Sequence, residues 1–143
     1  RQALAVAMGF QRYAERSGLI VWACAILPSH IHLVTARHRY FIERVVNLMK
    51  GDATRKLMEG GLHPFAHLRD ENGKVPRCWG GPGWNVYLST EEEIRGRIAY
   101  VEANPPREGK RKQRWSFVTP FRPEQLPQLR RVRREGRAGR LTG

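Results

Sequence analysis

The chain is poor in cysteine, in acidic residues and in long apolar stretches, and each shortage narrows what it can be. Two cysteines, Cys24 and Cys78, argue against a fold held by disulfides and favour a reducing cytoplasm. No apolar run approaches the roughly 20 residues of a membrane-crossing helix, and no signal-peptide pattern opens the chain. We therefore expect a cytoplasmic protein with no membrane partner and one modest domain.

The shortage of acidic residues leaves a large excess of positive charge. Lysine and arginine number 26 against 13 aspartate and glutamate residues, which gives a formal net charge of +13. Such a charge attracts polyanions, of which nucleic acid is the commonest. Charge alone leaves open a membrane-surface protein and a basic structural protein of the ribosomal kind.

Apolar periodicity and turn signals predict an α+β domain. In chain order they predict a helix over 3–17, strands over 20–27 and 31–36 that form a hairpin, a helix over 40–59, a loop over 61–83 and a short strand over 84–88. Thr90-Glu91-Glu92-Glu93 is a capping box that begins a third helix. We expect this helix to end at Asn104, because Pro105 disfavours helical backbone in the residue before it.

His30 and His32 are separated by one residue where the second strand of the predicted hairpin begins. Alternate side chains of a strand share a face, about 6.6–6.8 Å apart along the chain, so both imidazoles face one ion while Ile31 points into the core. The alternative is two ordinary histidines at a strand end. Histidine-triad nucleotide hydrolases have a third histidine two residues further on, but Val34 stands there.

Tyr100 lies off the apolar stripe of the third predicted helix. Ile94, Ile98 and Val101 form that stripe, and Tyr100 and Asn104 lie about 90–130° around the helix from it. Being four residues apart, Tyr100 and Asn104 are neighbours on one face. The alternative is a boundary tyrosine whose ring packs while its hydroxyl reaches water.

Two longer segments carry a family resemblance. Ala-Ile-Leu-Pro-Ser-His-Ile-His-Leu-Val (25–34) resembles the metal-binding HUH motif of single-tyrosine transposases, and Tyr-Val-Glu-Ala-Asn-Pro-Pro-Arg-Glu-Gly (100–109) resembles their nucleophile motif. The Asn-Pro after the tyrosine is most similar to the REP-associated tyrosine transposase branch. Leu-Met-Lys-Gly (48–51) and Trp-Ser-Phe (115–117) also resemble that branch. The resemblance covers roughly residues 3–121.

The resemblance implies a ferredoxin-like antiparallel sheet with helices packed on it. It assigns residues 1–121 to the transposase-like domain and leaves 122–143 as a basic tail, which we expect to be disordered. The family fold begins with a strand before its first helix, whereas this chain begins at the helix. We therefore expect either a truncated first strand or an incomplete sheet. Pro106 also replaces the more usual valine.

The same resemblance implies single-stranded DNA nicking and joining on hairpin or palindromic repeat DNA. Tyr100 would form a 5′-phosphotyrosine intermediate, and Mg²⁺ or Mn²⁺ would be held by His30, His32 and Asn104. The protein would act as a monomer or a homodimer, with the tyrosine helix working in cis or in trans. The alternative is a catalytically inactive, basic nucleic-acid-binding module derived from such a transposase.

Basic and aromatic residues supply candidate contacts with DNA. Single strands are usually bound by basic grooves with stacking aromatics. The candidate phosphate contacts are Lys50, Arg55, Arg97, Arg107, Lys110, Arg111, Lys112 and Arg114. Candidate stacking residues are Trp79, Trp84, Tyr87 and Trp115, for which core or loop packing is the alternative.

Overall fold

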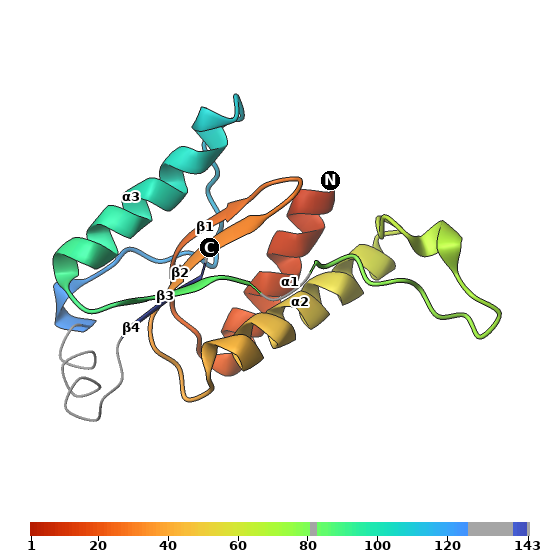
Figure 1. Cartoon of the computed structure of the whole chain (residues 1–143), viewed down its shortest axis with the longest axis horizontal. Coiled ribbons are helices and arrows are strands. Elements are labelled where there is room, and N and C mark those ends of the chain that lie inside the picture. Colours follow the sequence, from red (N-terminus) through yellow and green to blue (C-terminus); the bar gives the residue numbers. More distant parts are fainter. Residues whose placement is uncertain (81–82, 126–138, 143) are drawn as a thin grey trace.

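The computed structural model describes residues 1–80, 83–125 and 139–142, the last four by their backbone alone. Figure 1 shows a mixed α/β chain, as predicted. Its helices are α1 (Gln2–Ser17), α2 (Ile42–Glu59) and α3 (Glu91–Arg107), with short 3-10 turns η1 (Ala66–Leu68) and η2 (Pro123–Gln125). Its strands are β1 (Val21–Ile26), β2 (Ile31–Thr35), β3 (Asn85–Leu88) and β4 (Gly139–Thr142). None of the described helices is long and apolar enough to cross a membrane.

The four strands form one sheet in the order β1-β2-β4-β3, and each neighbouring pair is antiparallel. β1 and β2 are the predicted hairpin, with Ile26 opposite Ile31 at its tip. β4 lies between β2 and β3, and Thr142 pairs with Leu33 on one side and Asn85 on the other. β3 is therefore joined to the hairpin through β4.

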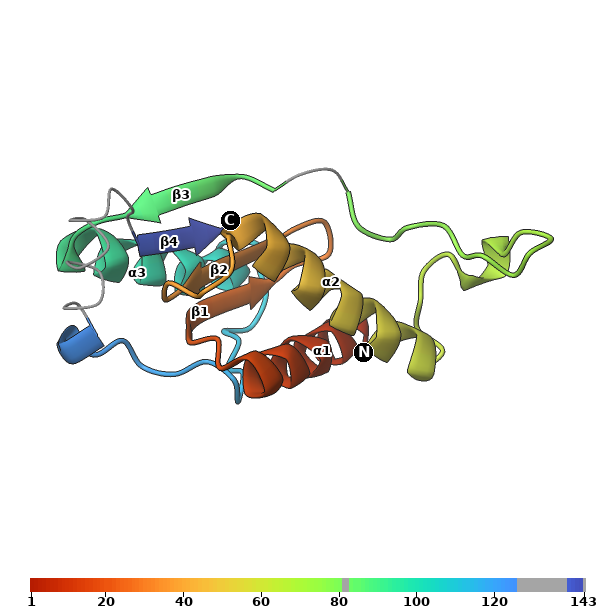
Figure 2. The same ribbon diagram turned by 90° about the horizontal axis from the view of Figure 1, so that it is seen from below.

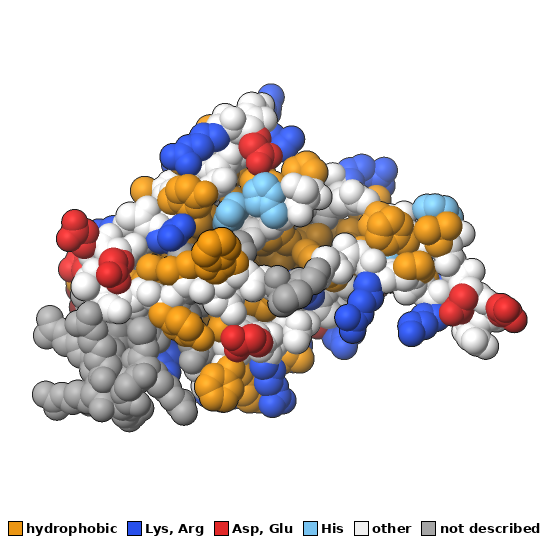
Figure 3. Space-filling view, in the orientation of Figure 1, with side chains coloured by type: hydrophobic (Ala, Val, Ile, Leu, Met, Phe, Trp, Pro, Cys, Tyr) orange, Lys and Arg blue, Asp and Glu red, His pale blue; other side chains and the backbone are white. Residues whose placement is uncertain are grey.

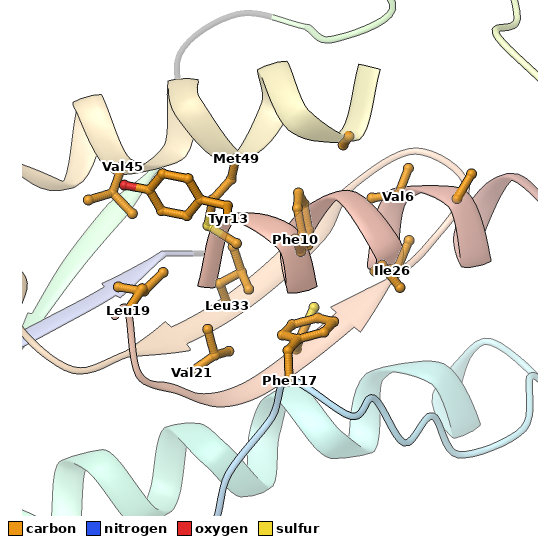
Figure 4. Packing of buried hydrophobic residues seen from close by; sticks show 14 of the residues in the cluster. Val6, Phe10, Tyr13, Leu19, Val21, Ile26, Leu33, Val45, Met49 and Phe117 are labelled. Carbon is orange, nitrogen blue, oxygen red and sulfur yellow. The ribbon is translucent and has the colours of Figure 1, made fainter. Parts of the chain in front are cut away.

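α1 and α2 cover one face of the sheet, as Figure 2 shows. The main core lies beneath them, and Figure 4 shows Phe10, Tyr13, Met49 and Phe117 within it. The two helices pack very closely at Gly9. A Cβ atom there would lie 2.4 Å from the Ala53 Cα, so this contact requires glycine.

A buried carboxylate also links these two helices. Asp52 of α2 is 1% exposed and accepts hydrogen bonds from Arg16 of α1 at 2.9 Å and from Arg55 at 2.7 Å. Both arginine side chains remain largely in solvent. A buried carboxylate needs such partners because its isolated charge is costly to remove from water.

α3 packs on the opposite face of the sheet, over β1 and β2. A smaller apolar cluster lies beneath it and includes Trp22, Val34, Ile94 and Val101. All six residues of β1 are buried, because helices cover both faces of this strand. This double burial explains why the β1 sequence is continuously apolar rather than alternating.

The chain after α3 returns along the outer edge of β1. The Gln113 side chain imitates a neighbouring strand there: its Oε1 accepts from the Ile26 N–H and its Nε2 donates to the Ile26 carbonyl, each at 2.7 Å. Further along, the Thr119 N–H donates to the Val21 carbonyl at 2.8 Å. Phe117 packs edge-on against Phe10, so this segment belongs to the core.

The predicted end of the third helix is wrong, because α3 continues through Pro105 and Pro106 to Arg107. Proline at these positions removes two backbone N–H donors, so the last turn of α3 forms two fewer helical hydrogen bonds than another sequence would. The Glu108 N–H donates to the Asn104 and Pro105 carbonyls, and the chain turns at Gly109 with φ +71°. The continuation of the helix brings Arg107 and Glu108 back toward the hairpin.

Of the predicted tail over 122–143, the structure describes only residues 122–125 and 139–142, and both parts contain regular backbone structure. Residues 123–125 form η2, and Gln125 accepts a hydrogen bond from the Trp22 indole at 2.9 Å. Residues 139–142 form β4 in the interior of the sheet. A long-range pairing of this kind leaves little local signal in the sequence. Residues 126–138 and Gly143 lie outside the described residues.

Candidate active site

The tip of the β1–β2 hairpin brings His30 and His32 together. Their ring centroids are 4.8 Å apart and the rings are nearly perpendicular. His32 lies on β2 in the same alternation as Val34, which packs under α3, whereas Ile31 packs in the opposite cluster. His30 itself lies in the turn just before β2, so only His32 of the pair is within the strand. Figure 3 shows histidine side chains on the molecular surface next to acidic and hydrophobic side chains.

Tyr100 reaches the same place from α3. Its ring centroid lies 5.9 Å from that of His32, with the rings perpendicular, and the residue is 40% exposed. Ile94 and Val101 anchor the opposite side of the helix in the apolar cluster, so the Tyr100 ring faces outward beside the histidines. Three residues from two distant segments of the sequence therefore meet, as their motifs predicted.

The start of α3 sets the position of Tyr100 along the sheet. The Thr90 hydroxyl accepts a hydrogen bond from the Glu93 N–H at 3.1 Å. The Glu93 carboxylate in turn accepts from the N–H groups of Ser89 and Thr90 at 2.6 and 3.2 Å. The predicted capping box is confirmed, and it fixes the first turn of the helix that carries the tyrosine.

His32 is held in its neutral form. Burial lowers the pKa of its imidazole, and nearby positive charge on His30 and Arg97 lowers it further. Glu108 opposes this effect with its negative charge. Because an ordinary histidine titrates near pH 6.5, a lowered pKa leaves the ring neutral at pH 7 with one nitrogen lone pair available.

Glu108 was not identified from the sequence. Its Oε1 lies 3.7 Å from Nε2 of His30, whose Nδ1 is 2.9 Å from the Ser29 hydroxyl. The carboxylate reaches the histidine because α3 extends three residues beyond its expected end. Glu108 lies within the tyrosine motif, which could have identified it. Because the helix was predicted to end at Asn104, nothing in the sequence indicated that the Glu108 side chain reaches His30.

Two arginines flank the Tyr100 ring. The guanidinium carbons of Arg97 and Arg107 lie 5.2 and 5.3 Å from its centroid. Both were predicted as phosphate contacts, and both lie where a phosphate at the tyrosine hydroxyl would need positive charge. The predicted site residues therefore include a tyrosine with two guanidinium groups close to its ring.

Asn104 is 9% exposed, and its Nδ2 donates to the Tyr100 carbonyl at 2.8 Å. This bond leaves Oδ1 as the atom that can bind a ligand. Among the described residues, no group of three or more His, Cys, Asp or Glu side chains is placed to hold a metal ion. The groups that could hold a cation are the two imidazoles, with ring centroids 4.8 Å apart, and the Glu108 carboxylate, 3.7 Å from His30.

The other predicted DNA contacts are spread over the molecule. The Lys50 ammonium lies 5.9 Å from the Trp79 ring, and Arg55 is bound to Asp52, so both have partners within the fold. Residues 110–112 and Arg114 are exposed after α3. Of the aromatic candidates, Trp84 is 79% and Tyr87 is 48% exposed.

Trp79 and Trp115, by contrast, pack against the main core.

Comparison with family models, curated proteins and solved structures found no match to this chain. Geometry therefore carries the functional argument: an exposed tyrosine, a neutral imidazole beside it, two flanking arginines and a nearby carboxylate.

Proposed function

We propose that this chain nicks and joins single-stranded DNA through a covalent bond to Tyr100. The observation that carries the proposal is the meeting of Tyr100 with His32 and His30 between α3 and the hairpin, with ring centroids 5.9 and 4.8 Å apart. A structural tyrosine does not require two histidines and two arginines around an exposed ring. The resemblance to single-tyrosine transposases describes the same residues in the same roles.

The chemistry is a transfer of a phosphodiester. The Tyr100 oxygen attacks phosphorus, the bond from phosphorus to the 3′-oxygen breaks, and that oxygen leaves as a hydroxyl after taking up a proton. The tyrosine proton passes to solvent, which the exposed side chain reaches. The resulting 5′-phosphotyrosine conserves the bond energy, so attack by another 3′-hydroxyl rejoins strands without a nucleotide cofactor.

Arg97 and Arg107 would hold the phosphate against the tyrosine and offset the charge that develops in the transition state. His30 and His32, with oxygen from Asn104 or Glu108, would hold Mg²⁺ or Mn²⁺, which supplies Lewis-acid polarisation of the phosphate when bound. The negative charge of Glu108, beside His30, opposes the effect of Arg97 on the His32 imidazole.

The strand arrangement supports a ferredoxin-like fold as part of this proposal. β2 and β3 are each antiparallel to β4, so they run parallel to each other, and α2 lies between them in the sequence. Two parallel strands joined by a helix, with another strand between them, form the split β-α-β unit of ferredoxin-like folds. In this proposal β4 occupies a central position of such a sheet.

A second candidate function is DNA binding without cleavage in the cytoplasm. The structure supports it in one respect, because no group of three or more His, Cys, Asp or Glu side chains that could hold a metal ion is found among the described residues. The net charge of +13 suits both candidates, since non-specific affinity for DNA comes from the phosphates. Covalent capture separates them, because a binding module forms no bond with its DNA.

The test incubates the protein with labelled single-stranded hairpin DNA and Mg²⁺ or Mn²⁺, and detects an adduct that survives SDS. We expect the adduct in the wild type and its loss in Tyr100→Phe, while Tyr40→Phe, which lies outside this site, keeps it. Mass spectrometry should locate the nucleotide on Tyr100. An undiminished adduct in Tyr100→Phe disproves the assignment, and binding without any adduct supports the second candidate.

A further inference from the structure

A hollow beside Tyr100 is not used by the chemistry described above. It is open, has a volume of about 460 Å³, and lies between β3 and α3. The strand contributes Val86, Tyr87 and Leu88, and the helix contributes Gly96, Arg97 and Tyr100. Arg97 and Tyr100 therefore belong both to the hollow and to the candidate active site.

Gly96 of α3 borders the hollow and has no side chain to fill it. A Cβ atom on this residue would meet no atom within 4 Å, so the helix has an empty surface there. Glu93, one turn earlier, also borders the hollow, but its carboxylate accepts the hydrogen bonds that cap α3. The negative charge nearest to the hollow is thus bound to backbone N–H groups.

The lining suits a flat aromatic group attached to a phosphate. Val86 and Leu88 supply apolar surface, and Tyr87 and Tyr100 are exposed aromatic side chains at 48% and 40%. The Arg97 guanidinium lies over the Tyr100 ring, where it can pair with a phosphate. Nucleobases of single strands bind to aromatic platforms that are flanked by basic groups.

We propose that this hollow binds the unpaired base of the nucleotide next to the phosphate that Tyr100 attacks. The proposal rests on the proposed function, because it takes the position of the phosphate from the role of Tyr100. It names the substrate more closely: a single strand, or a duplex from which this one nucleotide has been turned out. A stacked base in an intact duplex does not present its face to such a surface.

The test fills the hollow without weakening the fold. Gly96→Leu places a side chain in the empty space, and leucine favours a helix over glycine, so we expect the thermal stability of the protein to hold or rise. Gly51→Leu on α2 is the matched control, because a Cβ atom there also meets nothing within 4 Å. Both substitutions are made in a Tyr100→Phe background, so that binding is measured without cleavage.

We expect Gly96→Leu to raise the Kd for a single-stranded hairpin oligonucleotide by about tenfold or more, which is the usual effect of losing one base–aromatic stack. Gly51→Leu should leave the Kd unchanged. A series of oligonucleotides is then tested, each with one abasic site at a different position. At one position the abasic site should weaken binding to the parent protein, which keeps Gly96, but not binding to Gly96→Leu. That position should adjoin the cleaved phosphate.

Three outcomes overturn the proposal. In the first, Gly96→Leu binds every oligonucleotide as its Gly96 parent does. In the second, it loses affinity only to the same degree as Gly51→Leu. In the third, sedimentation shows a changed oligomeric state while DNA affinity stays intact, which would assign the hollow to a second copy of the chain. If the wild-type protein forms its adduct on Tyr100 normally while one of these results is obtained, the proposed function stands and only the base site fails. An abasic response without any adduct supports the base site and rejects the chemistry.

Discussion

The two faces of the sheet differ in how much they bury and in what they carry. The face under α1 and α2 holds the larger apolar cluster, the close contact at Gly9 and the buried Asp52. The face under α3 holds a smaller cluster, and at its margin are the histidine pair and the exposed Tyr100. The α1 and α2 face supplies most of the buried apolar surface, whereas the α3 face has a smaller apolar cluster that holds the helix carrying Tyr100.

The comparison shows how a small domain can carry polar groups that add little to its stability. His32 and Tyr100 lie beyond the edge of the Val101 and Ile94 packing, so exchanging them leaves the main core intact. Substitutions on the α3 face should therefore affect chemistry with little effect on folding. Substitutions between α1 and α2 should affect folding with little direct effect on chemistry.

The largest effect is expected from removing an imidazole on the α3 face. His32→Ala should slow adduct formation by at least about 100-fold, since it removes a proposed ligand of a cation whose Lewis-acid effect is worth several kcal/mol, and should change the free energy of unfolding by less than about 1 kcal/mol. His67→Ala, in η1 and exposed, is the matched control and should behave as the wild type. Cleavage kinetics and urea unfolding measure the two effects. Unfolding of His32→Ala at low urea would contradict the separation of the faces.

The next effect is expected at the contact between α1 and α2. Gly9→Ala should lower the free energy of unfolding by about 1–3 kcal/mol, because the new methyl group meets the Ala53 backbone and the helices must move apart. Gly51→Ala has open space around it and should raise stability by up to about 1 kcal/mol. Equal stabilities of the two variants in urea would show that the close contact is absent.

A smaller effect is expected from pH at His32. Its pKa lies below the ordinary value near 6.5, so as pH falls through 6.5 the unfolded chain takes up this proton before the folded chain does. The contribution of His32 to stability is thus present above about pH 6.5 and is lost as pH falls toward the folded-state pKa. An NMR titration of the metal-free protein should place the His32 pKa below 6.5, and Arg97→Gln should raise it. A value at or above 6.5 in the wild type would contradict the burial of this ring.

The smallest effect is expected from the basic segment before β4. Replacing Arg130, Arg131, Arg133, Arg134 and Arg137 by glutamine leaves residues 139–142 in place and removes five positive charges. If about half of these groups touch phosphate, the slope of log K against log salt for single-stranded DNA should become shallower by roughly 2. Cleavage at low salt should persist, because the proposed catalytic groups lie elsewhere. An unchanged slope would place the DNA on the surface around Lys50 and Arg97 instead.

Local patterns predicted most of the fold and the centre of the site. The capping box at Thr90 and the hairpin around Pro28 and Ser29 depend on neighbouring residues, so the sequence displays them directly. The alternation of His30 with Ile31 and His32 likewise depends only on strand geometry. In these elements the helix or strand period alone determines on which side of the element a residue lies.

Non-local pairings could not be predicted in the same way. Nothing near Asp52 indicates that Arg16 of another helix binds it, and this pairing gives Arg55 a role in the fold besides its predicted contact with DNA. Glu108 reaches His30 only because α3 runs through two prolines, against the local preference of Asn104. The sheet order depends on β4, a segment of four residues with no alternating apolar pattern.

The central position of β4 has a consequence for the order in which the domain assembles. The β1–β2 hairpin closes over a few residues, whereas pairing Thr142 with Leu33 closes a loop over most of the chain. Contacts between such distant residues form slowly, because the entropy of loop closure is lost before they contribute stability. Within the sheet, β3 pairs with β4 and not with the hairpin, and Val86 and Leu88 of β3 line the hollow. We therefore expect the histidine pair to form early in folding, and the strand pairing beside the surface proposed to receive the base to form later.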